Sequence, residues 1–149
     1  MEIKLDQITR KLTAKVTKEA ASRAFRAANQ LLTAEKEVLS GQRSGRVYRK
    51  PHTLHAMYQA SAPGEPPAVR TGTFRRSWRP ITGQEANGTG LTVKTAIFTG
   101  EGAGKSNPYP QILEHGSPHG MIAPRPFEKP IKDKAMPEIK KIYEEPYLS

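Results

Sequence analysis

The feature that most constrains the fold is an unbroken helical pattern over residues 5–39. Apolar side chains recur there at spacings of three or four residues, which is the pattern of an amphipathic helix. No glycine or proline interrupts the pattern, and Gly41 stands where a helix is expected to end. At about 1.5 Å per residue the predicted helix is roughly 50 Å long, so we expect part of it to pack on a neighbouring subunit. The recurring residues are Leu5, Ile8, Leu12, Val16, Ala20, Ala24, Ala27, Leu31, Ala34 and Val38.

Residues 41–72 break this regularity with glycines and prolines. Val47–Tyr48 and Leu54–Tyr58 are predicted to be short strands. The tract SAPGEPPAVRTG, residues 61–72, cannot continue a helix, because its prolines remove backbone donors and restrict the residues before them. Connections this long tend to be functional or disordered. We therefore predict an extended arm or a β-hairpin that reaches a neighbour, with residues 41–70 ordered only on assembly.

Short elements are predicted in the middle of the chain. Thr71 or Thr73 is a suitable cap for a short helix that Pro80 would end. A turn is predicted over residues 83–90, where glycines cluster. A strand is predicted over Leu91–Phe98, which carries valine, isoleucine and threonine side chains. The short helix is expected to carry Phe74, Ser77 and Trp78.

The last third of the chain is predicted to end in a helix. Loops over residues 100–107 and 115–126 flank a short helical turn over Tyr109–Glu114. Apolar residues at helical spacing then predict a helix over Phe127–Tyr143. Pro137 is expected to kink this helix or divide it in two.

Together these elements predict a single α+β domain over residues 1–149. It combines a long N-terminal helix, a small antiparallel β-sheet, a C-terminal helix and an extended proline-rich arm or loop at residues 41–72. Hydrophobic residues make up only 36% of the chain, so we expect a modest core, with some segments ordered by neighbouring subunits.

Positive charge is concentrated in the middle third of the chain. The formal net charge is +10, of which residues 41–79 carry +7, residues 1–40 carry +3 and residues 80–149 carry none. A concentrated basic field implies a polyanion or an acidic protein as partner. The arginines interleave with Tyr48 and Trp78. This pattern suits phosphate contact with base stacking, a solvated face, or pairing with carboxylates of a neighbouring subunit. The basic residues are Arg43, Arg46, Arg49, Lys50, Arg70, Arg75, Arg76 and Arg79.

Catalytic and metal chemistry finds no support in the residues. The chain has no cysteine, which excludes disulfides and thiolate sites. The pairs His52/His55 and His115/His119 lack a third ligand, so no metal is expected. The segment GEGAGKS is one residue too short for a phosphate-binding loop, and no nucleophile–base set is present. We predict no enzymatic activity and no cofactor.

Three segments resemble a known family in the same order along the chain. They are SAPGEPPAVRTGTFRRSW (61–78), YPQILEHGS (109–117) and APRPFEKPI (123–131). Together they resemble the neck or tail-completion components of long-tailed bacteriophages, a family of minor structural proteins. His115 stands where that family usually has an aromatic residue, and a phenylalanine replaces a leucine in the first motif. The matching residues are Thr71, Gly72, Phe74, Ser77, Tyr109, Glu114, Gly116, Arg125, Pro126 and Phe127.

The resemblance implies a structural virion protein. Such a protein forms an oligomeric ring at the head–tail junction, through which DNA passes, and it is made in the host cytoplasm during assembly. Its implied partners are further copies of itself, other head–tail connector and tail proteins, and the DNA in the lumen, but no membrane. The alternative from the residues alone is a free basic nucleic-acid-binding protein, which the high net charge favours.

The matching motifs also imply roles for individual residues. Gly72 and Gly116 are expected to supply unusual backbone angles at sharp bends. Phe127 is expected to anchor the last helix in the core, after Pro126 has set its start. Glu114 is expected to accept hydrogen bonds from a loop or to pair with Arg125.

Overall fold

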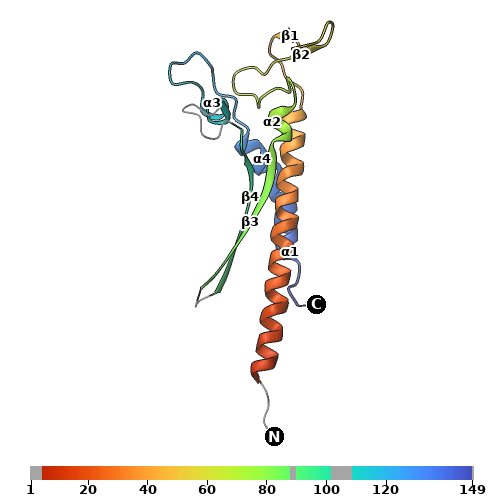
Figure 1. Cartoon of the computed structure of the whole chain (residues 1–149), viewed down its shortest axis with the longest axis vertical. Coiled ribbons are helices and arrows are strands. Elements are labelled where there is room, and N and C mark those ends of the chain that lie inside the picture. The colour runs from red at the N-terminus through yellow and green to blue at the C-terminus, as the bar shows by residue number, and fades with distance from the viewer. Residues whose placement is uncertain (1–4, 88–89, 102–108, 149) are drawn as a thin grey trace.

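A computed structural model describes residues 5–87, 90–101 and 109–148 of the protein. Figure 1 shows a long helix as a spine, with the other elements gathered around its C-terminal part. The elements in chain order are α1 (Leu5–Ser40), β1 (Val47–Arg49), β2 (Met57–Gln59), α2 (Thr73–Arg76), β3 (Trp78–Asn87), β4 (Gly90–Thr99), α3 (Tyr109–His115) and α4 (Glu128–Glu144).

The predicted α+β fold is confirmed, with two antiparallel hairpins in place of one small sheet. Strands β1 and β2 form one hairpin, and β3 and β4 form a second, longer one. The long hairpin and α4 both pack along α1, whereas β1–β2 lies beyond the C-terminal end of α1 (Figure 1). The helix boundaries expected from periodicity are confirmed to within one residue for α1, α3 and α4.

The core is a thin layer between α1 and α4. The large buried apolar side chains are Leu39 on α1 and Phe127, Ile131 and Ile142 on α4 and at its start. Leu39, Phe127 and Ile131 belong to one cluster with Ala34 and Ala135. Alanines let two helices approach closely, so the large side chains of one helix are covered by the backbone of the other. The buried alanines of α1 are Ala20, Ala24, Ala27, Ala28 and Ala34.

An aromatic cluster links the elements at the upper end of this core. The ring of Phe127 lies edge-on to Phe74 and to Trp78, with centroid distances of 5.3 and 5.8 Å. Tyr109 of α3 meets Phe74 of α2 in the same geometry, at 5.6 Å. Edge-to-face contacts of this kind stabilise by about 0.5–1.5 kcal/mol each beyond the buried area. Phe127 is only 2% exposed and therefore occupies the anchoring position expected of it.

The buried Arg23 of α1 fastens the C-terminal segment. Its guanidinium donates hydrogen bonds to the carbonyl oxygens of Tyr143 and Pro146. It also lies 3.8 Å from the centre of the Tyr147 ring and pairs with Glu19 one turn earlier on α1. The last carbonyls of a helix have no partner within the helix, and a guanidinium is well suited to satisfy them.

The long hairpin corrects two predictions. Residues 83–87 belong to β3 rather than to a turn, because they pair with the threonine- and valine-rich β4. The short helix α2 ends at Arg76, and Trp78 begins β3 instead of continuing the helix. Pro80 lies inside β3, where a two-stranded sheet leaves a free edge on which the missing donor is tolerated. The N-cap position of α2 is Gly72, and the Thr71 hydroxyl accepts the backbone N–H of Thr73, the first residue of the helix, at 3.5 Å.

Two further boundaries differ from the predictions. Strand β2 covers Met57–Gln59, not Leu54–Tyr58, because Lys50 donates its backbone N–H to the Ala56 carbonyl and closes the loop between the strands. Helix α4 continues through Pro137 as one element. The carbonyl left without a donor by this proline belongs to Asp133, which is exposed to water. The predicted loop over 100–107 lies mostly outside the described residues.

Candidate functional site

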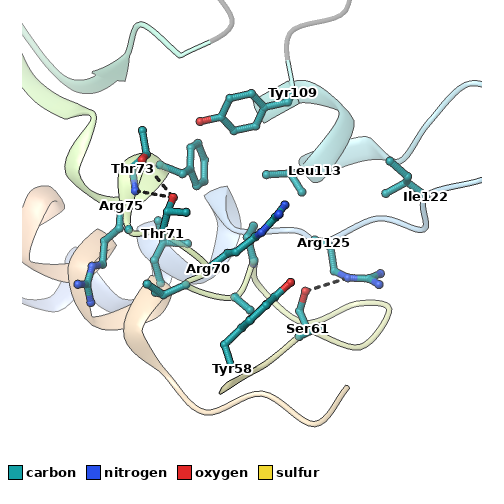
Figure 2. A pocket seen from close by; sticks show the side chains of 17 residues that line it. Tyr58, Ser61, Arg70, Thr71, Thr73, Arg75, Tyr109, Leu113, Ile122 and Arg125 are labelled. Carbon is teal, nitrogen blue, oxygen red and sulfur yellow. Dashed lines mark hydrogen bonds between the residues drawn. The ribbon is translucent and has the colours of Figure 1, made fainter. Parts of the chain in front are cut away.

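The three sequence segments that resemble the phage family converge on one cavity, here called the main cavity. Its volume is about 440 Å³. Figure 2 shows Tyr58 and Ser61 on one side, Tyr109 and Leu113 on the opposite side, and Arg70 between them. The remaining lining residues are Leu39, Ala60, Pro67, Ala68, Val69, Thr71, Gly72, Thr73, Phe74, Arg75, Ile122 and Arg125.

Backbone hydrogen bonds hold these separate segments together. Gly64 donates its N–H to the Pro124 carbonyl at 2.9 Å, and Arg125 donates its N–H to the Leu113 carbonyl. The Arg125 side chain adds a hydrogen bond from Nε to Oγ of Ser61 at 2.9 Å (Figure 2). The wall of the main cavity is therefore built from chain segments more than fifty residues apart, and its shape depends on the whole fold.

Glu65 folds the proline-rich tract back onto the end of α1. Its carboxylate accepts hydrogen bonds from the backbone and hydroxyl of Ser44 and from the backbone N–H of Ala62. These bonds, led by the Ser44 hydroxyl, lower the pKa of Glu65 to about 2. Arg43 reinforces the fold by donating to the carbonyl oxygens of Val38 and Pro67. The expected β-hairpin is thus present and braced, and its reach to a neighbouring subunit stays a prediction.

Glu114 connects α3 to the start of α4. Its Oε2 accepts the backbone N–H groups of Phe127 at 2.8 Å and Glu128 at 3.2 Å. The first N–H groups of a helix lack partners within the helix, and a carboxylate there also complements the helix dipole. Of the two roles expected for Glu114, hydrogen bonding is the one observed. Pairing with Arg125 is not, because that guanidinium donates to Ser61, Ala123 and Pro124 instead.

The two motif glycines adopt the unusual backbone angles expected of them. Gly72 has φ 81° and Gly116 has φ 84°, both in the left-handed region that side chains disfavour. At Gly116 a Cβ atom would also lie 2.9 Å from the Ile122 carbonyl oxygen, so space as well as angle requires glycine there.

Two hydroxyl groups of the motifs hold neighbouring elements in place. Ser77 contacts the Phe74 carbonyl and the Thr99 hydroxyl, which ties the end of α2 to β4. The Tyr109 hydroxyl lies near Glu101, and burial, with a hydrogen bond to that carboxylate, raises the pKa of Tyr109 to about 12. Pro126 directly precedes Phe127, the residue that caps α4.

The eight basic residues do not form one belt. Arg43 braces the arm, Arg75 donates to the Ser40 hydroxyl, and Arg79 donates to the carbonyls of Arg76 and Trp78. Arg76 is exposed on α2. The other four cluster near the β1–β2 hairpin: Arg46, Arg49, Lys50 and Arg70.

Three of that last group line an open hollow next to the hairpin loop, here called the hairpin hollow. Its volume is about 470 Å³, and Arg49, Lys50 and Arg70 line it together with His52 and Leu54. None of the eight basic residues takes part in any ion pair found among the described residues. The positive charge of the middle third is therefore not neutralised within the described chain.

The aromatic residues expected beside the arginines are not equivalent. Trp78 packs on Phe127 in the core, so its ring is not a free platform for a nucleobase. Tyr48 stays exposed on the hairpin, with its ring 6.0 Å from that of Tyr58. The proposed combination of arginine and stacking aromatic therefore persists only at the β1–β2 hairpin.

Glu35 is a buried carboxylate that the periodicity argument did not single out. It is fully buried on α1, and neither of its side-chain oxygens has a hydrogen-bond partner. Burial raises the pKa of Glu35 to about 7, against an opposing effect from Lys36 and Arg75. Its position one turn from Leu31 and from Leu39, on the apolar face of the predicted helix, was the available signal.

The groups around the main cavity offer binding rather than acid–base chemistry. Its described lining contains hydroxyls and guanidiniums, with no carboxylate or imidazole that would serve as a base. No group of three metal-ligating side chains occurs among the residues that the structure describes. In that same part of the chain, no helix has the length and apolar character needed to cross a membrane.

Comparison with known proteins returns no match to any family model, curated protein or solved structure.

Proposed function

We propose that this protein is a structural subunit of a tailed bacteriophage, which assembles into a closed ring at the head–tail junction through which DNA passes. The three motif segments motivate the proposal. The observation that carries it is the unusually large surface of the isolated chain. In this role the protein binds other proteins and catalyses no reaction.

The accessible surface of the chain is 10709 Å². A compact folded chain of this size exposes about 7,500 Å². Among the described residues ten apolar side chains are buried, and six of these are alanines. Such a shape leaves much apolar surface without cover, which is typical of a subunit that is completed by its neighbours.

The N-terminal half of α1 supplies one uncovered surface. Ile8 and Leu12 are 53% and 46% exposed and lie one turn apart on the same face of the helix. Figure 1 shows the N-terminal turns of α1 projecting beyond every other described element. Large apolar side chains spaced in this way form the contact stripe of a helix that packs on a partner.

The outer face of the β3–β4 hairpin supplies a second uncovered surface. Its inner face packs on α1, where Thr95 donates its hydroxyl to the Ala24 carbonyl. The opposite face carries Ile81 and Phe98, both about half exposed. A ring requires two different complementary surfaces on each subunit. In the proposed ring, the N-terminal half of α1 of one copy packs on the outer face of β3–β4 in the next.

The rival function is that of a free nucleic-acid-binding protein. The basic residues near the β1–β2 hairpin favour it, since they have no ion-pair partner among the described residues. Such a protein would bind duplex DNA as a monomer. Its affinity would fall steeply with increasing salt concentration, because the release of counterions from the DNA is then less favourable.

Light scattering of the purified protein, at low and high salt and with or without duplex DNA, separates the two functions. The ring proposal expects a discrete oligomer whose mass does not depend on DNA. The double variant Ile8→Ser with Leu12→Ser is expected to be monomeric, because it removes the helix stripe. The matched control, Thr13→Ser with Ala14→Ser, changes exposed residues of the same helical half and is expected to keep the oligomer. A wild-type monomer that binds DNA in a strongly salt-dependent manner would support the rival.

A further inference from the structure

The β1–β2 hairpin is a second kind of uncovered surface, different from the helix stripe. Its cross-strand pairs are Val47–Gln59, Tyr48–Tyr58 and Arg49–Met57. Residues directly opposite one another share a face of the sheet, so Tyr48 and Tyr58 lie on one face. The other face carries the remaining four residues. All four residues of that second face are exposed in the described chain.

The residues of this hairpin have the composition of a protein interface. Leu54 at the loop and Met57 on β2 are 78% and 54% exposed, and Val47 is similarly uncovered. Arginines lie among them, and no acidic residue occurs between positions 41 and 64. Interfaces between proteins are enriched in aromatic residues, methionine and arginine, and depleted in aspartate and glutamate.

This composition favours a protein over DNA as the partner. Contact with phosphates is made by charged and polar groups, and base stacking needs exposed aromatic rings. Exposed Leu54 and Met57 would gain nothing from a phosphate backbone but would gain from burial against apolar side chains. Of the two aromatic residues predicted to stack, Trp78 is turned into the core and Tyr48 alone stays exposed.

Charge balance favours a different protein over a second copy of this chain. Residues 1–40 carry net charge +3 and residues 80–149 carry none, so neither region has an acidic excess. Five of the exposed acidic side chains already pair with a lysine or arginine of their own chain. These are Glu37, Glu85, Asp133, Glu138 and Glu145. The chain therefore has no acidic excess that matches the hairpin, and this favours another protein as the partner.

We infer that the β1–β2 hairpin is a docking surface for a different protein, whose contact region is acidic at its edges and apolar at its centre. The hairpin hollow is lined by Arg49, Arg70 and Leu54. In the proposed contact the two arginines bind carboxylates of the partner, and Leu54 packs on an apolar side chain of the partner. Within the proposed ring, this contact joins the subunit to another component of the particle, so this part of the inference rests on the proposed function.

The hairpin is held ready for such a contact by the segments below it. Glu65 bonds to Ser44 at the base of β1, and the Gln59 side chain donates to the Gly45 carbonyl. A Cβ atom at Gly45 would lie 2.5 Å from the Ala60 carbonyl oxygen, which shows how closely the two strands' bases approach. A surface that is already ordered loses less conformational freedom when it binds.

Fluorescence anisotropy with three labelled probes tests the inference on the full-length protein. The first probe is a peptide that alternates glutamate with leucine and tyrosine. The second is a peptide of equal length and equal charge that alternates glutamate with serine, and the third is a short duplex DNA. The apolar acidic peptide is expected to bind at least about tenfold more tightly than either of the others.

Variants assign the binding to the hairpin. Leu54→Ser with Met57→Ser is expected to reduce the affinity for the apolar acidic peptide to that for the serine peptide. Arg49→Glu with Arg70→Glu is expected to abolish binding of both peptides. Met121→Ser and Lys132→Glu change an exposed apolar and an exposed basic residue elsewhere, and they are expected to leave both affinities unchanged.

Three results would overturn the inference: tighter binding of the duplex than of either peptide, equal affinity for the two peptides, or unchanged binding by the Leu54/Met57 variant. The mass of that variant gives an independent readout. It is expected to match the wild type, and loss of oligomers would show that the hairpin faces a second copy instead. Failure of the wild type to form any oligomer would count against the ring alone and would leave the peptide results standing. Thermal unfolding of each variant confirms that it is folded.

Discussion

The two halves of α1 have the same helical period and opposite surroundings. Residues 6–15 are exposed throughout, including Ile8 and Leu12, whereas burial begins at Ala20 and continues to Leu39. The C-terminal half is covered by α4 and by the β3–β4 hairpin, and the N-terminal turns of α1 project past the other described elements (Figure 1).

Side-chain size accounts for the difference between the halves. The covered half contributes its buried alanines and, near its end, Leu39, which belongs to one cluster with Phe127 and Ile131. The bare half carries isoleucine and leucine, which need a partner with room for them. A helix of 36 residues thus has one part that packs within its own chain and one part whose apolar side chains stay exposed.

Removing a large side chain from each half is the strongest test of this contrast. Leu39→Ala is expected to lower the free energy of unfolding by about 2–5 kcal/mol, because it leaves a cavity in the core. Leu12→Ala, the same change in the bare half, is expected to alter it by less than about 0.5 kcal/mol. Urea denaturation of the dilute, monomeric protein measures both. Equal losses would mean that the bare half is covered in solution.

The buried carboxylate of Glu35 makes the stability of the covered half depend on pH. Burial raises the pKa of Glu35 from 4.5 to about 7. Between these values the folded chain holds a proton that the unfolded chain has released. The stabilising contribution is therefore fully present below pH 4.5 and is lost as pH rises through about 7, a change on the order of 3 kcal/mol.

Glu35→Gln is expected to remove this pH dependence, because an amide does not titrate in this range. Urea denaturation from about pH 5 to about pH 8 follows the change between the unfolded-state and folded-state pKa values and measures the difference from the wild type. Glu37→Gln is the matched control, since that exposed carboxylate pairs with Lys134, and it is expected to keep the wild-type dependence. A parallel profile for Glu35→Gln and the wild type would contradict the assignment.

Enlarging an alanine distinguishes the halves by space rather than by lost contact. Ala28→Leu is expected to destabilise the fold by about 1–3 kcal/mol. Ala28 is fully buried on α1, so the elements packed around it leave no room for the added atoms. Ala14→Leu in the bare half is expected to have no measurable cost. Thermal unfolding followed by circular dichroism measures both. Tolerance of leucine at position 28 would show that the packing around Ala28 is looser than the structure indicates.

Removing the hydrogen bonds at the start of α4 is expected to lower the free energy of unfolding by less than the core substitutions do. Glu114→Ala removes the acceptor of the Phe127 and Glu128 N–H groups and is expected to cost about 1 kcal/mol. Glu138→Ala, whose partner Lys141 is exposed, is expected to cost less than about 0.5 kcal/mol. An unchanged melting temperature for Glu114→Ala would exclude the capping role.

Elements with a strong local pattern were predictable, and those that depend on pairing were not. The α1 and α4 periods follow from residue preferences alone, and the glycine bends at Gly72 and Gly116 were expected from the matching motifs. Residues 83–87 were read as a turn because of their glycine and asparagine content, yet pairing with β4 extends them as a strand. The capping threonines and Pro80 predict a helix that carries Trp78, yet Trp78 begins β3 and packs on Phe127.

The candidate surfaces divide in the same way. The residues of the three motifs and the basic middle segment are visible in the amino-acid order, but their meeting at the main cavity is not. Arg125, Ser61 and Leu113 become neighbours only through long-range hydrogen bonds. The separation of the basic residues into bracing arginines and a free hairpin group likewise depends on which carbonyls the fold brings within reach.

The amino-acid order alone therefore specified a long helix, a glycine- and proline-rich arm and a terminal helix, because helical period and backbone restriction act over a few residues. It left open which half of α1 would be covered, which carboxylate would be buried and which arginines would stay free. Those outcomes depend on packing and hydrogen bonds between segments distant in the chain, whose energies exist only once the segments have met.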